Sequence, residues 1–463
     1  MNKDFEDKVK LIHDYFHSYG LRKTGGVIES HDEMLAMMSD PNKKNDFIKY
    51  VHEGFRLGQD ILIAELIQNE KSRKELNGEL KEHRKNRDKE KADEIGFEIK
   101  KLEYMEAVLR NLADSLAWLL MNGQHWIARR WYSGSRSRPS LLNSNIESLH
   151  IAAASYYKQH PNGFALYSDL TSFVDIGDLI VITEEGQLKS VEVKEGSKSK
   201  EVFKFMDKHK NSKDFKPETL GLDKHDNPMK FLDQVERTIR QMEKGSRLTN
   251  LIKNEKGPDP FTGQNTVIGE ISHPLEFYHD VVFSMFQELK TSIWSHRVIE
   301  GIVYVGMYRN TAIRKSTNTF ESFISTKFEE KFPVMPYNSQ LFAPIKEPIF
   351  QKPYGTDNIM SIVLGRTVML VCVDLNALLQ LFNSNGIEAK WMSRKETQKS
   401  KETGAKFPKP FEFNKQAISV VKDGKKLILG DGFLSRLVYD SLLPSSLVET
   451  YQDRLAPQSD EEE

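Results

Sequence analysis

Hydrophobic residues between positions 61 and 120 recur at the spacing of one helix face. Leucines between 62 and 80 form a first stripe, and a second stripe runs from Ile95 to Leu120. The stretch 81–94, which separates them, consists almost entirely of charged and polar residues. Apolar residues three or four positions apart lie on the same side of an α-helix. The sequence therefore predicts a charged helical hairpin at about 61–120, with its polar tip within 81–94.

A different pattern marks residues 175–196, which read DIGDLIVITEEGQLKSVEVKEG. Two runs rich in Val, Ile and Leu flank the segment Glu184-Glu185-Gly186. A glycine suits the left-handed position that closes a three-residue hairpin loop. If Thr183 pairs with Gln187 across this loop, antiparallel counting puts Asp178 opposite Glu192.

This register sorts the side chains onto two faces, because they alternate along a strand. One face combines the charged residues Asp178, Glu192 and Lys194 with two isoleucines. Asp175 is an alternative to Asp178, but its odd offset puts it on the other face. We expect that other face to pack in the core, and it contains Leu179, Val181, Val191 and Val193.

Two carboxylates directly opposed on a sheet repel each other, so the pairing of Asp178 with Glu192 calls for a compensating positive charge. Mg²⁺ prefers such hard oxygen ligands and usually keeps water molecules and substrate phosphates as its other ligands. A bound divalent ion activates water and neutralises charge that builds on a phosphodiester. Lys194 lies on the same face, where an ammonium group can orient water or stabilise that charge.

The D…E-x-K pattern of Asp178, Glu192 and Lys194 resembles the active site of the PD-(D/E)XK nuclease superfamily. The proline that often precedes the first aspartate is Gly177 here. The neighbouring elements are predicted as a helix at 144–160, a strand at 164–170, the two hairpin strands, a helix at 228–244 and a buried strand at 298–307. This α-β-β-β-α-β order is similar to the restriction-endonuclease-like core. The resemblance covers residues 140–310, with insertions at 196–226 and 245–273.

The resemblance implies a metal-dependent nuclease that hydrolyses phosphodiester bonds in DNA rather than RNA. Asp178 and Glu192 would bind Mg²⁺, for which Mn²⁺ would substitute, and Lys194 would complete the catalytic set. Many stand-alone members of the superfamily act in restriction or anti-phage defence, which makes such a role an expectation for this chain.

The resemblance also implies two accessory residues. Glu147, in the first turn of the leading helix, matches a further metal-binding acid, although the helix dipole alone favours an acid there. Gln234, on the helix after the hairpin, matches a polar residue that faces the site. Arg237 and Gln241 share its polar side.

Two basic segments are candidates for nucleic-acid contacts. Arg129 and Arg130 stand among tryptophans and a tyrosine, which can stack on bases. The connection from Lys194 to Lys216 carries eight lysines against four acids, and its candidate contacts are Lys198, Lys200 and Lys204. The alternatives are arginines that snorkel from a helix end and a solvated loop.

Composition narrows the class of protein. The chain has 463 residues, 29% of them charged, and a net charge of −1, so any attraction for nucleic acid must be local. Its single cysteine, Cys372, lies in an apolar run and is expected in the core; disulfides and cysteine-rich zinc sites are excluded, which suits the cytosol. The N-terminus has no apolar signal region. Arg366 and Asp374 interrupt the most apolar stretch, 359–382, so we expect no membrane span.

The predicted organisation is α/β of the α+β kind, in three parts. A helical domain (1–135) precedes the nuclease-like core, and a mixed α/β region (333–458) and an acidic tail (459–463) follow it. In the last region, Asp423-Gly424 predicts a two-residue hairpin turn, and lysine-rich residues 390–410 are expected to be mobile. The charged helical hairpin is either a solvated helix pair or an arm for a homo-oligomer or a partner protein.

Two functions of different classes follow from these patterns. The first is the nuclease, which uses all three charged residues of the hairpin. The second is a non-catalytic nucleic-acid-binding or scaffold protein that retains a nuclease-like core, and it would not need the complete set. A third possibility, a purely helical interaction protein, requires that the 175–196 hairpin be absent.

Overall fold

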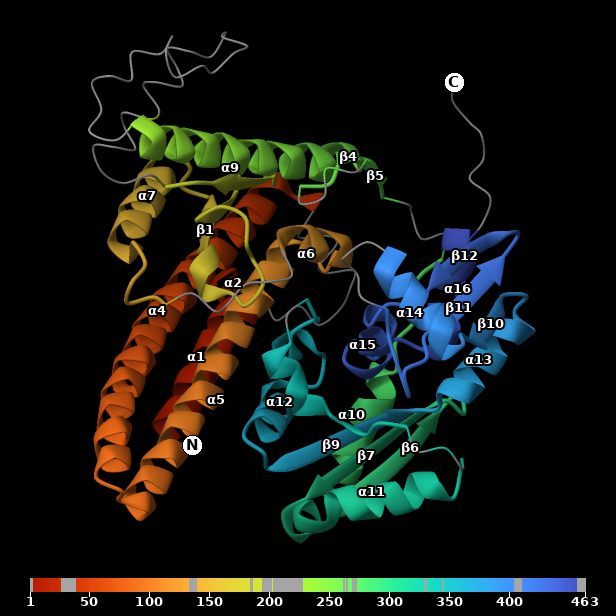
Figure 1. Cartoon of the computed structure of the whole chain (residues 1–463). Coiled ribbons are helices and arrows are strands. Elements are labelled where there is room, and N and C mark those ends of the chain that lie inside the picture. Colours follow the sequence, from red (N-terminus) through yellow and green to blue (C-terminus); the bar gives the residue numbers. More distant parts are fainter. Residues whose placement is uncertain are drawn as a thin grey trace, which may run out of the picture. The chain divides into compact units, whose positions relative to one another are not determined.

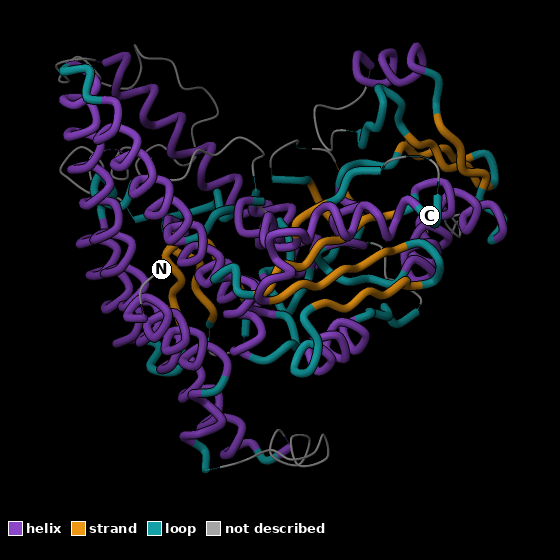
Figure 2. The backbone as a smooth tube through the Cα atoms, turned by 90° about the horizontal axis from the view of Figure 1, so that it is seen from below, coloured by secondary structure: helices purple, strands orange, loops and turns teal. Residues whose placement is uncertain are grey.

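The computed structural model describes residues 3–25, 39–132, 140–183, 186–193, 202, 228–260, 263, 265–268, 273–328, 330, 332–343, 345–403 and 410–455. The chain forms two compact units, residues 2–268 and 269–463, which we call the N-terminal and C-terminal units. Both combine helices with small antiparallel sheets (Figures 1 and 2), as the α+β prediction requires.

Helices dominate the first half of the N-terminal unit. They are α1 (Lys3–His17), α2 (Tyr19–Lys23), α4 (Pro41–Lys85), α5 (Lys89–Leu120) and α6 (His125–Trp131). The two long helices α4 and α5 run side by side as a hairpin (Figure 1). Aspartates cap both: Asp40 accepts hydrogen bonds from the first backbone N–H groups of α4, and Asp88 accepts one from the Lys91 N–H of α5. The turn between the helices falls within the predicted polar tip.

The helical hairpin changes character along its length. Its distal half is held by a thin seam of Leu80, Ile95 and Ile99, flanked by Leu76 and Ala92. In contrast, nearly every residue of α5 from position 106 to 120 is buried. The root of the hairpin therefore belongs to the core of the N-terminal unit, and only its distal half is a solvated helix pair.

The second half of the unit contains a three-stranded sheet and its flanking helices. In chain order they are α7 (Ile146–Gln159), β1 (Phe164–Tyr167), the 3₁₀ turn η1 (Ser168–Leu170), β2 (Leu179–Ile182), β3 (Leu188–Val191) and α9 (Pro228–Asn254). The strands pair antiparallel in the order β1-β2-β3, with Leu179 opposite Val191. The Thr183 N–H donates to the Gln187 carbonyl at 3.0 Å, which confirms the predicted register of the hairpin.

The prediction of one core face on this hairpin is wrong. Ile180 is as buried as its neighbours Leu179 and Val181, all three at 3% exposure or less, so both faces of the central strand β2 are covered. Val191 is instead 36% exposed, because β3 is an edge strand of the sheet. Alternation predicts which side chains share a face but not whether that face is covered.

The predicted sixth element of the core is not part of this sheet. Residues 298–307 form the end of β6 (Trp294–Ile299) and the start of β7 (Val303–Arg309), separated by a turn in which Glu300 and Gly301 have positive φ. Both strands lie in the C-terminal unit, and the N-terminal unit extends to residue 268. A fully buried strand has no periodicity that identifies its sheet, so the apolar run alone could not assign it.

The predicted insertion at 245–273 begins inside a helix. Helix α9 continues ten residues past Lys244 to Asn254, because Leu248 and Leu251 extend its buried stripe and outweigh the weak helix propensity of Gly245. It leads into a small hairpin of β4 (Lys256–Pro258) and β5 (Asn265–Val267).

The C-terminal unit holds two antiparallel sheets. The first, in the order β6-β7-β9-β8, adds β8 (Met335–Pro336) and β9 (Thr367–Val373) to the two strands above. His296 of β6 stacks on Phe323 of α11 (Ser316–Ser325), whereas the next residue, Arg297, bonds to Glu288 of α10 (His279–Glu288). Because adjacent side chains point to opposite faces, the two helices cover opposite sides of this sheet.

The second sheet, in the order β10-β11-β12, lies farther along the chain. Its strands are β10 (Glu388–Trp391), β11 (Ile418–Lys422) and β12 (Lys425–Ile428), with α14 (Arg394–Thr403) after the first. Within the lysine-rich stretch 390–410, the end of β10 and the helix α14 are regular, contrary to the expectation of mobile chain, and residues 404–409 lie outside the described residues. The helices α12 (Thr356–Val363), α13 (Leu375–Ser384), α15 (Gly432–Val438) and α16 (Pro444–Leu455) complete the unit.

Two expectations about apolar segments can be compared with this fold. Cys372, on β9, is fully buried as predicted, and burial raises the pKa of its thiol to about 12, which makes it unreactive. Across the part of the chain described above, every helix is too short or too polar to cross a bilayer.

Two glycines of α4 give a matched test of helix packing. A Cβ atom at Gly54 would lie 2.4 Å from the Tyr15 carbonyl oxygen of α1, whereas one at Gly78 would meet nothing within 4 Å. We expect Gly54→Ala to destabilise the protein by about 1–3 kcal/mol through overpacking. Gly78→Ala should stabilise it by about 0.4–1 kcal/mol, because alanine restricts the unfolded chain. Thermal unfolding measures both, and similar shifts for the two variants would contradict the close approach of α1 to α4.

Candidate active site

The predicted catalytic residues lie where the β2–β3 ladder ends. The last pair is Leu179 with Val191, so Asp178 and Glu192 are the next residues of the two strands. Asp178 leaves the regular ladder in a bend, and its N–H donates to the Val191 carbonyl at 2.9 Å. Its Oδ2 accepts the Val193 N–H at 2.7 Å. The carboxylate therefore replaces a backbone acceptor and lies beside the segment that carries Glu192.

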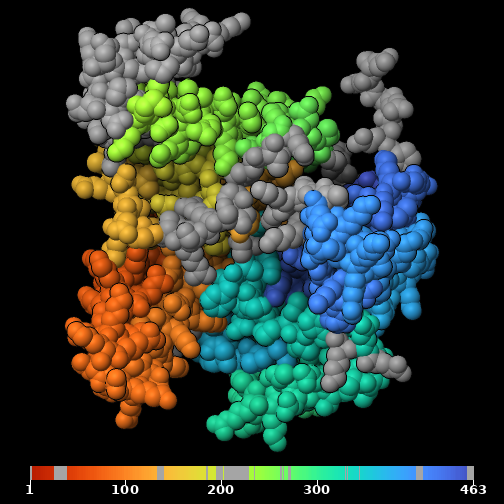
Figure 3. Space-filling model, viewed as in Figure 1, coloured from red at the N-terminus to blue at the C-terminus, as the bar shows by residue number. Residues whose placement is uncertain are grey.

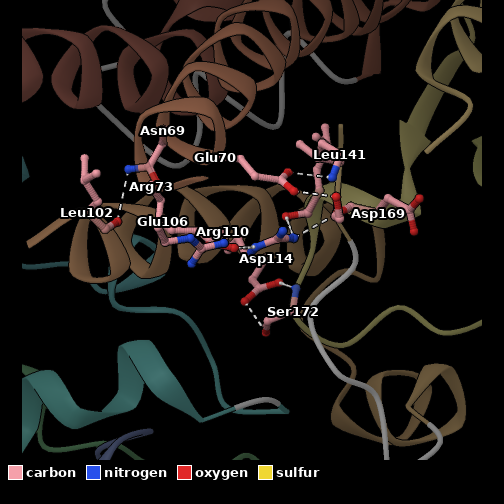
Figure 4. A network of polar contacts seen from close by, with 12 residues as sticks. Asn69, Glu70, Arg73, Leu102, Glu106, Arg110, Asp114, Leu141, Asp169 and Ser172 are labelled. Carbon is pink, nitrogen blue, oxygen red and sulfur yellow. Dashed lines mark hydrogen bonds and ion pairs between the residues drawn. The ribbon is translucent and has the colours of Figure 1, made fainter. Parts of the chain in front are cut away.

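The loop that delivers Asp178 is fixed to the helices by buried charges (Figure 4). Glu106 of α5 binds Arg73 of α4 at 2.5 Å and Arg110 at 2.8 Å, and Arg110 also donates to the Asp169 carbonyl of η1. Asp114 accepts hydrogen bonds from the N–H and Oγ of Ser172 at 2.7 and 2.6 Å. These interactions hold the chain between β1 and β2 against α5. They therefore help to fix the position of Asp178, which lies at the end of this segment.

A second group of charges acts electrostatically on Lys244 of α9. The negative charges of Asp175, Glu192 and Asp259 all act on its ammonium group. We call these three acids the carboxylate cluster. Burial lowers the pKa of Lys244, and the carboxylate cluster opposes that effect. The site thus contains a partly desolvated lysine in the field of three acids from three separate segments of the chain.

Backbone hydrogen bonding explains how Asp175 reaches this group. Its N–H donates to the Trp131 carbonyl at the end of α6 at 2.7 Å. The adjacent Tyr132 has a raised pKa, caused mainly by burial and further by the charge of Asp175. By strand alternation, Asp175 would lie on the face opposite Asp178, but this expectation assumes that the strand is extended as far as residue 175. The chain bends before β2, so alternation does not apply to Asp175.

The sequence patterns do not identify Lys244 and Asp259, although a signal for Lys244 exists. It lies four and seven residues before Leu248 and Leu251, which are both buried, and so shares their helix face. A lysine on an apolar helix face indicates a buried partner. Asp259 stands in an irregular Pro-rich segment, where no periodic pattern indicates its position.

The other predicted site residues have varied positions. Glu147 is exposed in the first turn of α7, and no hydrogen bond or ion pair in the described part of the chain joins it to the hairpin acids. Arg129 is exposed at the end of α6, whereas Arg130 pairs with Asp259 at 2.9 Å. Gln234 lies on α9, and its side chain is outside the described set. The remaining four also lie outside the described residues: Lys194, Lys198, Lys200 and Lys204.

The described residues contain no group of three or more His, Cys, Asp or Glu side chains that could hold a metal ion by themselves. Asp178 and Glu192 supply two carboxylates, which is a common protein contribution to Mg²⁺ because water and substrate phosphates supply the remaining ligands. The donor set at the end of the hairpin therefore suits a weakly held Mg²⁺ and not a metal enclosed by protein ligands.

A cavity of about 670 Å³ in the C-terminal unit has a different chemistry. It lies between α11 and the chain that leads to β8, and the described residues of its lining include Glu321, Glu330, Phe328 and Phe332 but no lysine or arginine. Two acids without a basic residue repel a phosphodiester. This cavity is therefore not a candidate for the chemistry predicted at the hairpin.

No protein family, curated protein or solved structure matches this chain. The resemblance to the PD-(D/E)XK superfamily accordingly depends on the residue pattern and the order of elements alone. Of that order, the helix α7, the three strands β1–β3 and the helix α9 are present in sequence within the N-terminal unit.

The hydrogen bond between Asp178 and Val193 can be tested by amide exchange. Asp178→Ala leaves the Val193 N–H without its acceptor, at a cost of about 1–3 kcal/mol, whereas Asp178→Asn retains an oxygen at that place. We expect hydrogen–deuterium exchange over residues 188–193 to accelerate in the alanine variant and to stay near the wild-type rate in the asparagine variant. Equal exchange in wild type and Asp178→Ala would contradict this hydrogen bond.

The proximity of Glu192 to Lys244 has its own test. Glu192→Gln removes one of the negative charges that stabilise the ammonium form, so the pKa of Lys244 should fall further below its ordinary value. Competitive acetylation between about pH 8 and 11, read by mass spectrometry, measures this pKa. The matched control is Glu236→Gln, an exposed acid of the same helix. If both variants titrate alike at Lys244, Glu192 does not act on it.

Proposed function

We propose that this protein is a divalent-metal-dependent nuclease that hydrolyses phosphodiester bonds, with DNA as its preferred substrate. The observation that carries the proposal is the pairing of Leu179 with Val191. It makes Asp178 and Glu192 the next residues of two adjacent strands, and the bond from the Val193 N–H holds the Asp178 carboxylate there. The preference for DNA comes from the superfamily that the pattern resembles.

Asp178 and Glu192 are the residues that would hold Mg²⁺. When bound, the ion would supply Lewis acidity, which promotes ionisation of water and neutralises charge on the phosphodiester. The Asp178 Oδ2 already accepts the Val193 N–H, and this bond orients the carboxylate.

The lysines contribute positive charge on the protein side. Lys244 lies partly desolvated near Glu192, and a fixed positive charge in such surroundings stabilises developing anionic charge more strongly than one in water. Lys194 follows Glu192 by two residues. Its proposed role in orienting the attacking water comes from this sequence pattern alone. Asp175 and Asp259 help to keep Lys244 protonated.

A hydrolysis assay tests the proposal. Wild-type protein is incubated with supercoiled plasmid, and in parallel with single-stranded RNA, in Mg²⁺, Mn²⁺ or EDTA. We expect metal-dependent nicking of the plasmid and no cutting in EDTA. Glu192→Gln and Asp178→Asn should lower the rate on the order of 10²-fold or more, the scale of losing a group that stabilises transition-state charge.

Controls separate this loss from a folding defect and from the alternative function. Glu236→Gln, which changes an exposed glutamate of α9, should cut at the wild-type rate. Thermal unfolding should be similar in all these variants. Cutting that survives in Glu192→Gln would refute the proposed site. Wild-type protein that retains nucleic acid but never cuts it would instead favour the non-catalytic binding protein.

A further inference from the structure

The charge of the chain is unevenly distributed. Residues 388–428 contain eleven lysines and arginines against five acids, a net charge of +6. The whole chain has 66 basic and 67 acidic residues, which leaves 55 and 62 elsewhere and a net charge of −7 for the rest. We call β10, α14, β11 and β12 the basic module. A net charge of this size within so few residues is a local positive field on an otherwise acidic protein.

One face of the β10-β11-β12 sheet packs against the rest of the C-terminal unit. Ala389, Ile418 and Val420 are almost fully buried, and the sheet contacts helices α13 and α16 on the rest of the unit. Lys390 and Lys426 lie on the opposite face, because they pair with Ser419 and Val421. Lys422 and Lys425 lie at the turn, where the packed face ends, and further basic residues lie along α14. The module forms part of the surface of the C-terminal unit (blue in Figure 3).

The turn of the module brings lysines close together. Lys422 of β11 is directly opposite Lys425 of β12, and Lys426 follows. Like charges directly opposed on a sheet destabilise it. An anion bound at the tip of the hairpin would offset this repulsion, just as a cation offsets the repulsion of opposed carboxylates.

Acids of the module neutralise only part of this charge. Glu388 pairs with Lys390 at 2.6 Å and Glu412 with Lys401 at 2.5 Å. Glu396 acts on Lys426 and Lys390. Within the described residues, four further basic side chains form no ion pair: Arg394, Lys395, Lys415 and Lys422. These four residues lie at the start of α14, in the loop before β11 and at the end of β11.

The kind of residue indicates the kind of anion. Ten of the eleven basic residues are lysines, which act as point charges toward phosphate, whereas arginines read bases through paired hydrogen bonds. Trp391, the aromatic residue of β10, is half-buried and donates its indole N–H to Asn376, so it is not presented for stacking on bases. These features fit a repeating phosphate backbone that is bound without regard to sequence.

A lipid surface is the other common polyanion, but it fits less well. Peripheral membrane-binding surfaces combine lysines with large exposed apolar residues that enter the lipid. Among the described residues of the module, Leu427 is the one large hydrophobic side chain that is exposed.

We propose that the basic module binds the phosphodiester backbone of nucleic acid, independently of base sequence, and so holds the substrate. The statement that the bound nucleic acid is the substrate rests on the proposed function. Binding itself depends on lysines of the C-terminal unit, whereas Asp178 and Glu192 belong to the N-terminal unit.

The test measures binding of the full chain to a short fluorescein-labelled DNA duplex by anisotropy, in EDTA so that no hydrolysis occurs. The test variant is Lys422→Gln/Lys425→Gln/Lys426→Gln. The matched control, Lys290→Gln/Lys315→Gln/Lys327→Gln, removes three exposed lysines of the same unit that lie outside the module. We expect the test variant to bind at least tenfold more weakly. Its dependence on salt should also fall, by about 0.9 in the log–log slope for each phosphate that the variant no longer neutralises.

Each outcome decides the proposal. Equal affinity of the two triple variants, or no DNA binding by wild type, would overturn it. Binding of wild type to phosphatidylserine vesicles in preference to the duplex would also overturn it, in favour of a membrane surface. If Glu192→Gln binds DNA normally but the wild type does not cut it, the nuclease proposal alone is refuted. If the wild type cuts DNA but the triple lysine variant binds it normally, the proposed role of the basic module alone is refuted.

Discussion

The buried carboxylate of Glu106 is the group on which the N-terminal unit depends. It lies between two guanidinium groups, Arg73 of α4 and Arg110 of α5, and is itself 5% exposed. Removing charges from water costs several kcal/mol each unless they are paired and hydrogen-bonded, so Glu106 and Arg110, which are both buried, depend on this pairing. Arg110 also donates to carbonyl groups of η1. The long helices and the strands are thereby parts of one core, although the sequence suggests a separate helical domain.

The same network determines the geometry of the candidate site. The chain leaves η1, is held at Ser172 by Asp114, and reaches Asp175 and then Asp178 through a bend. A regular strand over this stretch would have separated Asp175 from Glu192 by the rule of alternation. The bend instead lets both act on Lys244, while Asp178 closes the end of the ladder. Local anchoring of a loop, more than strand pairing, sets which acids come together.

Opposite charges are concentrated in different parts of this molecule. In the N-terminal unit, the charges of three acids act on Lys244. In the C-terminal unit, lysines lie together at the β11–β12 turn. The net charge of −1 conceals both, because it averages over the chain. For the nuclease that we propose, the first environment would serve the reaction and the second would retain the substrate.

The sequence by itself determined the long helices, the β2–β3 register and the turn at Asp423-Gly424, because helix stripes, turn glycines and antiparallel counting are local properties. It also indicated Asp178 and Glu192 as neighbouring strand residues. Tertiary structure decided the rest. It covered both faces of β2, assigned residues 298–307 to another sheet, and brought Asp175, Lys244 and Asp259 together from segments that are distant in sequence. Such arrangements depend on which surfaces are buried against each other, and no local pattern in the chain records that choice.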